Sequence, residues 1–180
     1  MEEATEMTAA EKGSLLHFVL QHMNFGEELS EAGIRKQLEA MVMAELLTEI
    51  QSQNVNIHKI ISFMKSPLGR RVTEAKILYR EIPFTMEVEC AEVFGSFAEC
   101  THEGETIVLQ GIIDCCFEEE GKLVLVDYKT DYIPQGKTEQ IKEKYRTQIE
   151  YYARALGQIT GKEIAGKYIY SFWIDSAIEY

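Results

Sequence analysis

Basic side chains are scarce in this sequence, and long apolar runs are missing from it. Its 180 residues hold 18 Lys and Arg against 30 Asp and Glu, which gives a net charge of −12. Because phosphate contacts come mainly from Lys and Arg, this balance argues against a free-standing nucleic-acid-binding protein. No run approaches the roughly 18 apolar residues of a membrane span, and the first residues are acidic where a secretory signal is basic. We therefore expect no membrane association and a cytoplasmic location.

Cysteine pairs with the CxxC spacing of metal sites are also missing. The four cysteines show no CxxC spacing, so neither a zinc site nor an iron–sulfur cluster is expected. In a cytoplasmic protein these thiols would stay reduced. The residues are Cys90, Cys100, Cys115 and Cys116.

The charge that is present is unevenly distributed. Residues 137–167 contain seven basic and four acidic side chains, so this segment carries +3 within a chain of −12. The segment could lie along a substrate backbone, or it could be the solvated face of a mixed-charge helix. The length and a hydrophobic content of 46% predict one globular domain covering residues 1–180.

Apolar periodicity predicts helices first and strands later. Thr8 and Glu11 form a capping-box pattern before a helix, Ser30 can cap a second one, and Asn56 can open a third. From residue 81 the apolar period changes toward two, which favours strands. The expected helices are 9–20, 31–51, 57–64 and 137–157, and the expected strands are 82–88, 106–117, 122–130 and 165–174. This order predicts an α/β fold with a mixed central sheet flanked by helices and a helical N-terminal part.

Two aspartates and a lysine end the predicted hairpin strands. Asp114 closes one apolar run, and Asp127 closes the next. Alternation along a strand places Lys129 on the same face as Asp127. Two carboxylates and an ammonium on one face suit metal-assisted phosphodiester cleavage, because carboxylates hold hard divalent cations. The alternatives are that both aspartates are surface acids at strand ends and that Lys129 protects a sheet edge.

Five short motifs occur in an order that resembles a known nuclease family. They match the RecB-like nuclease domains of the PD-(D/E)xK superfamily, which has the restriction-endonuclease fold, and are most similar to the C-terminal nuclease domain of AddAB helicase–nuclease A subunits. Ile113 replaces the superfamily's proline, and Asp127 replaces its glutamate. The motifs are Gly13-x-x-x-His17, Arg80-Glu81-Ile82-Pro83-Phe84, Gly111-x-x-Asp114, Asp127-Tyr128-Lys129-Thr130 and Gln148-x-x-x-Tyr152.

The resemblance implies a role for each motif. Asp114 and Asp127 would bind Mg²⁺ or Mn²⁺, together with His17 and the backbone carbonyl of Tyr128. Lys129 would assist water attack or stabilise charge. Alternatively, His17 is a packing residue. Glu81 would approach the metal or pair with a basic side chain. Gln148 and Tyr152 lie four apart on one helix face and would contact DNA or pack in the core.

The resemblance also implies a setting. The domain would be excised from a larger polypeptide whose helicase portion, with a second AddB-like subunit, delivers single-stranded DNA during end resection and recombinational repair. Gly136-Lys137-Thr138 imitates the end of a phosphate-binding loop, but Asp131 stands where that loop needs glycine, so no nucleotide site is expected here. The alternative function is a catalytically silent nuclease fold that docks partners or guides DNA.

Overall fold

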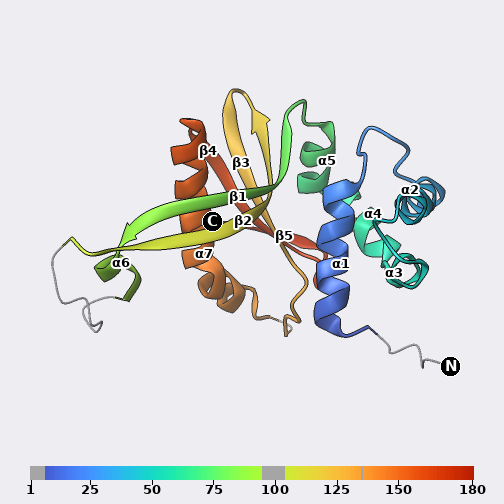
Figure 1. Cartoon of the computed structure of the whole chain (residues 1–180), viewed down its shortest axis with the longest axis horizontal. Coiled ribbons are helices and arrows are strands. Elements are labelled where there is room, and N and C mark those ends of the chain that lie inside the picture. The colour runs from blue at the N-terminus through green and yellow to red at the C-terminus, as the bar shows by residue number, and fades with distance from the viewer. Residues whose placement is uncertain (1–6, 95–103, 135) are drawn as a thin grey trace.

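A five-stranded sheet divides the helices into two groups (Figure 1). The computed structural model describes residues 7–94, 104–134 and 136–180. The helices are α1 (Ala9–His22), α2 (Glu31–Met43), α3 (Glu49–Asn54), α4 (Ile57–Lys65), α5 (Pro67–Glu74), α6 (Cys90–Phe94) and α7 (Thr138–Thr160). The strands are β1 (Leu78–Glu89), β2 (Thr106–Glu119), β3 (Lys122–Lys129), β4 (Ile164–Ser171) and β5 (Ser176–Glu179).

The sheet is mixed, as the sequence predicts. Its strand order is β1-β2-β3-β4-β5, and every neighbouring pair is antiparallel except β3 and β4. These two parallel strands are joined by α7, because a parallel connection needs a crossover long enough to hold a helix. The α/β fold with a mixed central sheet and flanking helices is therefore confirmed.

Strand β3 is the centre of the molecule because it is covered on both faces. Val124, Val126 and Tyr128 pack into a core shared with the N-terminal helices. Leu123 and Leu125 point the other way, into a core shared with α7. A strand buried on both faces reads as a nearly continuous apolar run, and this strand does so until Asp127. Lys122 and Lys129 mark the two ends of β3, and Asp127 is the one charged residue buried within it.

The long β1–β2 hairpin changes the face that it presents to the core halfway along its length. In β2, Ile113 packs toward α7, whereas Cys115, in the same phase of the strand, packs toward the N-terminal helices. The register runs unbroken on both sides, with Arg80 opposite Cys115 and Ile82 opposite Ile113. Between them Glu81 has φ of 52°, a left-handed conformation that is unusual for such a residue. The hairpin therefore twists sharply where Glu81 and Asp114 face each other.

Two predicted elements differ from the structure. The second helix does not continue to residue 51 but ends at Met43, and Glu45 adopts a φ of 58°. Thr48 then caps a new helix through a capping box with Gln51. The predicted closing strand 165–174 ends at Ser171, where a turn reverses the chain into β5. In both places a polar cap or turn stops an element that apolar periodicity alone would extend.

The cysteines also differ in part from expectation. Cys115 and Cys116 are buried free thiols, but Cys90, at the start of α6, is disulfide-bonded. The expectation of a reduced thiol is therefore wrong for Cys90, while Cys100 lies outside the described residues. No helix among the described residues is long and apolar enough to cross a membrane.

Candidate metal and nuclease site

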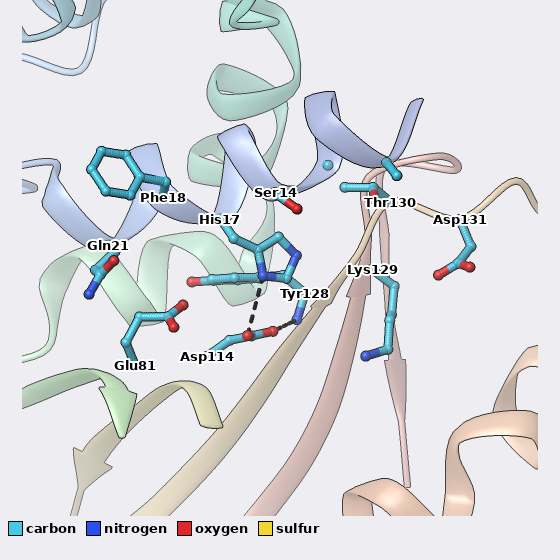
Figure 2. A pocket seen from close by; sticks show the side chains of 12 residues that line it. Ser14, His17, Phe18, Gln21, Glu81, Asp114, Tyr128, Lys129, Thr130 and Asp131 are labelled. Atoms are coloured by element: carbon cyan, nitrogen blue, oxygen red, sulfur yellow. Dashed lines mark hydrogen bonds and ion pairs between the residues drawn. The ribbon is translucent and has the colours of Figure 1, made fainter. Parts of the chain in front are cut away.

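Three side chains from three separate elements meet at the twist of the hairpin. His17 on α1, Glu81 on β1 and Asp114 on β2 each offer a ligand atom, and these atoms lie within 4.8 Å of one another. His17 Nδ1 is 3.3 Å from Asp114 Oδ1, while the backbone N–H of Tyr128 donates a 2.7 Å hydrogen bond to Asp114 Oδ2. Figure 2 shows the three side chains converging between α1 and the sheet. One imidazole and two carboxylates form a donor set that suits a divalent cation.

Helix α1 can approach the sheet because of the glycine in its first motif. A Cβ added to Gly13 would lie 2.6 Å from the Thr130 side-chain oxygen at the end of β3. His17 follows Gly13 by four residues, so it lies on the same helix face and meets Asp114. The Gly13-x-x-x-His17 spacing thus reflects a close helix–sheet contact followed one turn later by a ligand.

Arg80 fixes the other end of α1. Its Nη1 donates hydrogen bonds to the carbonyls of Leu20 (2.9 Å) and Met23 (2.6 Å). The last carbonyls of a helix lack intrahelical partners, and a cation there also complements the helix dipole. The guanidinium lies 5.1 Å from the ring centre of Phe25 as well. Arg80 therefore couples the position of His17 to β1, the strand that carries Glu81.

The Glu81 and Asp114 carboxylates oppose each other across the hairpin. Partial burial and the charge of Asp114 raise the pKa of Glu81, while His17 and His22 act in the opposite direction. Burial lowers the pKa of His17, but its hydrogen bond with Asp114 and the charges of Asp114 and Asp127 outweigh burial and raise it. Like charges directly opposite one another destabilise a strand pair. A bound cation would remove this repulsion, so the residues present fit the metal that the family resemblance implies.

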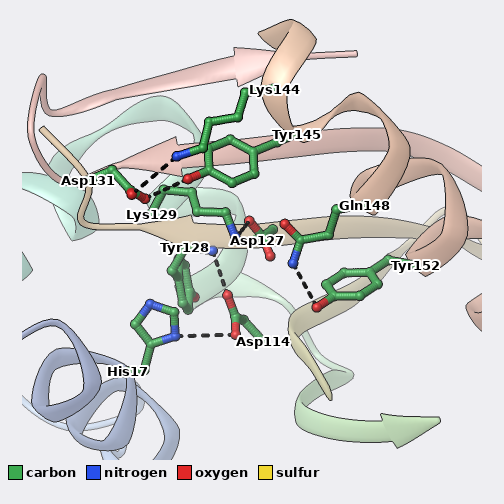
Figure 3. Close-up of polar contacts among 10 residues, drawn as sticks. All are labelled: His17, Asp114, Asp127, Tyr128, Lys129, Asp131, Lys144, Tyr145, Gln148 and Tyr152. Carbon is green, nitrogen blue, oxygen red and sulfur yellow. Dashed lines mark hydrogen bonds and ion pairs between the residues drawn. The ribbon is translucent and has the colours of Figure 1, made fainter. Parts of the chain in front are cut away.

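Asp127 and Lys129 form a buried pair beside this cluster (Figure 3). Asp127 is only 2% exposed, and its Oδ2 lies 2.6 Å from Lys129 Nζ. This contact is an ion pair, and the buried oxygen has no other donor among the described residues. Burial raises the pKa of Asp127 to about 6 against the opposing effect of Lys129. Burial lowers the pKa of Lys129, but the charge of Asp127 outweighs it and raises that pKa.

Tyr145 on α7 completes the surroundings of Lys129. Its ring centre lies 4.6 Å from the ammonium, and its hydroxyl donates a 2.8 Å hydrogen bond to Asp131 Oδ2. The sequence-based reasoning did not select Tyr145. It could have been found by spacing, because residues 145, 148 and 152 lie on one helix face at intervals of three and four.

Gln148 and Tyr152 also face the site from α7. Gln148 Nε2 donates a 2.8 Å hydrogen bond to the Tyr152 hydroxyl, and the Tyr152 ring packs edge-on against Phe84. Both rings cover Gly111, where an added Cβ would lie 2.7 Å from Phe84 and 3.5 Å from Tyr152. Three of the sequence motifs therefore meet in one aromatic contact, and Tyr152 is both a packing residue and a neighbour of the site.

A cavity of about 450 Å³ opens over these groups. It places His17, Glu81 and Asp114 beside Lys129, so the predicted residues from α1, β1, β2 and β3 do come together. Asp127 lies outside the cluster of three, although its charge raises the pKa of His17 and the charge of Asp114 raises the pKa of Asp127. The lining residues are Ala10, Gly13, Ser14, His17, Phe18, Gln21, Glu81, Asp114, Tyr128, Lys129, Thr130 and Asp131.

The basic segment after β3 is less available for phosphate than its composition suggests. Five of its seven cations are held in ion pairs, several of them with acidic residues of other elements. Such pairs lower the positive potential that a nucleic-acid backbone would meet. The paired residues are Lys144, Arg146, Arg154, Lys162 and Lys167.

Fold, donor set and motif order together define a nuclease of the restriction-endonuclease type, and comparison with known families agrees. The sequence model of the PD-(D/E)XK nuclease superfamily matches residues 1–176, so the chain belongs to that superfamily. The predicted family resemblance is thereby confirmed.

The A subunits of several bacterial ATP-dependent helicase/nucleases are similar to nearly the whole chain. The one from Acetivibrio thermocellus is 49% identical over 96% of this chain. Those from a Thermoanaerobacter species and Clostridium novyi are 48% and 44% identical over 100% and 99% of it. The chain spans only 14% of the length of each of these curated relatives.

Proposed function

We propose that this chain is a metal-dependent deoxyribonuclease domain that hydrolyses DNA phosphodiester bonds. The observation that carries the proposal is the convergence of His17, Glu81 and Asp114 within 4.8 Å, in a cavity that also receives Lys129. Membership of a nuclease superfamily supports the same reaction class. We propose residues 1–180 as one such domain.

Each residue of the site has a proposed role. His17, Glu81 and Asp114 would hold Mg²⁺ or Mn²⁺, with Asp127 and the Tyr128 carbonyl as further oxygen ligands. The cation would neutralise phosphate charge and lower the pKa of water. The Lys129 ammonium would orient the attacking water or stabilise the charge that develops on the phosphate, and Tyr145 and Asp127 hold it in place.

Gln148 and Tyr152 would contact the DNA beside the cleaved bond. Their mutual hydrogen bond leaves the second amide hydrogen and the carbonyl oxygen of Gln148 as further groups for hydrogen bonding. Both residues lie on α7, whose Tyr145 borders Lys129. The DNA strand would therefore run between α1 and α7, over the end of β3.

We further propose a cellular setting from the family resemblance and from the relatives' description as helicase/nuclease subunits. The domain would be part of a longer polypeptide with a helicase portion and would work with a second AddB-like subunit in the cytoplasm. It would cut single strands exonucleolytically as the helicase unwinds them during double-strand-break repair. An acidic chain in which five of the seven cations of residues 137–167 are in ion pairs agrees with a DNA path supplied mostly by other parts. We therefore expect weak, salt-sensitive cleavage by the isolated chain.

The test is cleavage of end-labelled single-stranded and duplex DNA with Mg²⁺, with Mn²⁺ and with EDTA. The parent chain is compared with Asp114→Asn and Lys129→Ala, and Glu163→Gln serves as a control that removes an exposed carboxylate paired with Lys122. We expect metal-dependent cutting, faster on single strands, that both site variants abolish and the control retains. Circular dichroism checks that each variant folds.

Metal binding measured by calorimetry separates the two possible functions. Binding by the parent that Asp114→Asn abolishes would support the nuclease even if the isolated chain cuts slowly. A folded parent chain that neither binds metal nor cuts any strand would contradict the nuclease proposal and favour the silent docking module.

A further inference from the structure

Two aromatic side chains touch each other in solvent next to the proposed nuclease site. Tyr132 is 66% exposed and Trp173 is 50% exposed, and their ring centres lie 4.7 Å apart in an edge-to-face contact. Such a contact covers at most one face of either ring. Exposed aromatic side chains cost solvation free energy, so a touching pair beside a catalytic cavity points to a ligand that covers them.

Both rings are held close to Lys129. Tyr132 follows Lys129 by three residues, which limits the distance between their Cα atoms to about 11 Å. Trp173 stands in the turn between β4 and β5, and the preceding residue, Phe172, donates a 2.8 Å backbone hydrogen bond to the Lys129 carbonyl. Lys59 fixes the far side of this turn through a 2.9 Å contact with Asp175. The pair is therefore anchored to the end of β3 rather than carried on a free loop.

A groove of about 640 Å³ lies along Trp173. Gly13 and Thr130 line both this groove and the catalytic cavity, so the two hollows lie on either side of the contact between α1 and the end of β3. The groove is lined by Lys12 and by Arg35 and Lys59, which form ion pairs with Glu31 and Asp175. Its wall beside Trp173 is therefore polar and largely charge-balanced.

We propose that Tyr132 and Trp173 form a stacking platform for the bases of a single strand of DNA as it enters or leaves the nuclease site. This inference rests on the proposed function and adds to it the means by which single strands are held. Unpaired bases stack on aromatic rings regardless of sequence, and two touching exposed rings beside the end of β3 offer such a surface. A duplex keeps its bases stacked on one another and cannot use the platform.

Trp173 is the only tryptophan of the chain, so its fluorescence reports on the platform directly. The parent chain is titrated in EDTA, where the strand stays intact, with oligothymidine, with an abasic strand of equal length and with a duplex. Labelled-strand anisotropy then compares Tyr132→Ala and Trp173→Ala with Tyr79→Ala, a control at an exposed aromatic residue at the start of β1. Cleavage with Mg²⁺ gives KM and kcat for the same variants.

We expect oligothymidine to quench Trp173 more strongly than the abasic strand or the duplex. Each platform variant should weaken single-strand binding by roughly 5- to 150-fold, the range for loss of one base-stacking contact, and should raise KM with little change in kcat. Tyr79→Ala should behave like the parent.

Other outcomes would overturn the inference. Cleavage by the parent that both platform variants retain, without any change in Trp173 fluorescence, would refute the platform and leave the proposed nuclease intact. Equal quenching by the abasic strand would also refute it, because no base would then be stacked. A folded parent that binds no metal and neither cuts nor binds any strand would refute the proposed function, and the platform with it. The groove would then be covered by another part of a longer polypeptide.

Discussion

Replacing Asp127 by asparagine should stabilise the metal-free protein, even though Asp127 belongs to the proposed site. This carboxylate is 2% exposed, and burial raises its pKa from 3.8 to about 6 despite the nearby Lys129 ammonium. The ionised form is therefore less favourable in the folded chain than in the unfolded chain. At 1.36 kcal/mol per pH unit, an interval of about 2 units corresponds to about 3 kcal/mol at neutral pH. Asparagine keeps the shape and removes the charge.

The effect has a defined pH dependence. Because the folded-state pKa is higher than the unfolded-state value, the folded chain binds more protons between pH 3.8 and about 6. The free energy of unfolding of the parent therefore falls, from this group, as pH rises through that window. The advantage of Asp127→Asn should be complete above pH 6 and should vanish near pH 4.

Urea unfolding in EDTA measures this difference. With a slope of about 2 kcal/mol per M, the midpoint at pH 7.5 should rise by about 1.5 M for Asp127→Asn, with an unchanged slope. Glu163→Gln, which removes a carboxylate from the exposed pair with Lys122, should change stability by less than about 0.5 kcal/mol.

Adding Mg²⁺ should reverse the order. A cation that binds the ionised carboxylate stabilises the folded parent by mass action and stabilises the asparagine variant less. If Asp127→Asn is equally stable or less stable than the parent in EDTA at pH 7.5, the argument from burial is refuted. That result would mean that the ion pair with Lys129 stabilises the folded chain more than burial of the charge destabilises it.

Three further substitutions test how the site is positioned. Gly13→Ala should slow cleavage about tenfold or more, because the new Cβ would lie 2.6 Å from the Thr130 side-chain oxygen and displace α1. Adding Thr130→Ala should restore the rate, and a double variant as slow as the single one would contradict this contact. Glu81→Gly should raise the free energy of unfolding in EDTA by about 1 kcal/mol by relieving the left-handed backbone, while weakening metal binding seen by calorimetry. Arg80→Met should lower the free energy of unfolding by about 1.5–3 kcal/mol and speed amide hydrogen exchange at the end of α1, because two carbonyls lose a charged donor. Unchanged exchange there would show that Arg80 does not hold the helix that carries His17.

Sequence periodicity could predict the fold because local and tertiary preferences agree along most of the chain. The capping box at Thr8 and the continuous apolar run of β3 both form as expected. Periodicity failed at residue 45, where one left-handed residue ends α2 before its apolar pattern stops. It failed again after Ser171, because a turn followed by a four-residue strand leaves too short a pattern to detect.

The site was predictable in its membership but not in its geometry. Spacing along a strand correctly placed Asp127 and Lys129 together, and the motifs selected His17, Glu81 and Asp114. Nothing in the sequence indicates that Glu81 adopts a positive φ, because glutamate rarely does. The twist at this residue decides which acids meet, and it depends on the whole hairpin being held between two cores. Tyr145 was missed because its role depends on where α7 crosses Lys129.

Three costs to stability coincide at this one place in the fold. Glu81 holds a strained backbone, its carboxylate faces that of Asp114, and burial raises the pKa of Asp127 to about 6. Each costs on the order of 1–3 kcal/mol, a large fraction of the stability of a small domain. One divalent cation beside these carboxylates would offset the repulsion between their charges. The strain at Glu81 then has a reason, because only the twisted backbone brings its carboxylate to the ligand position.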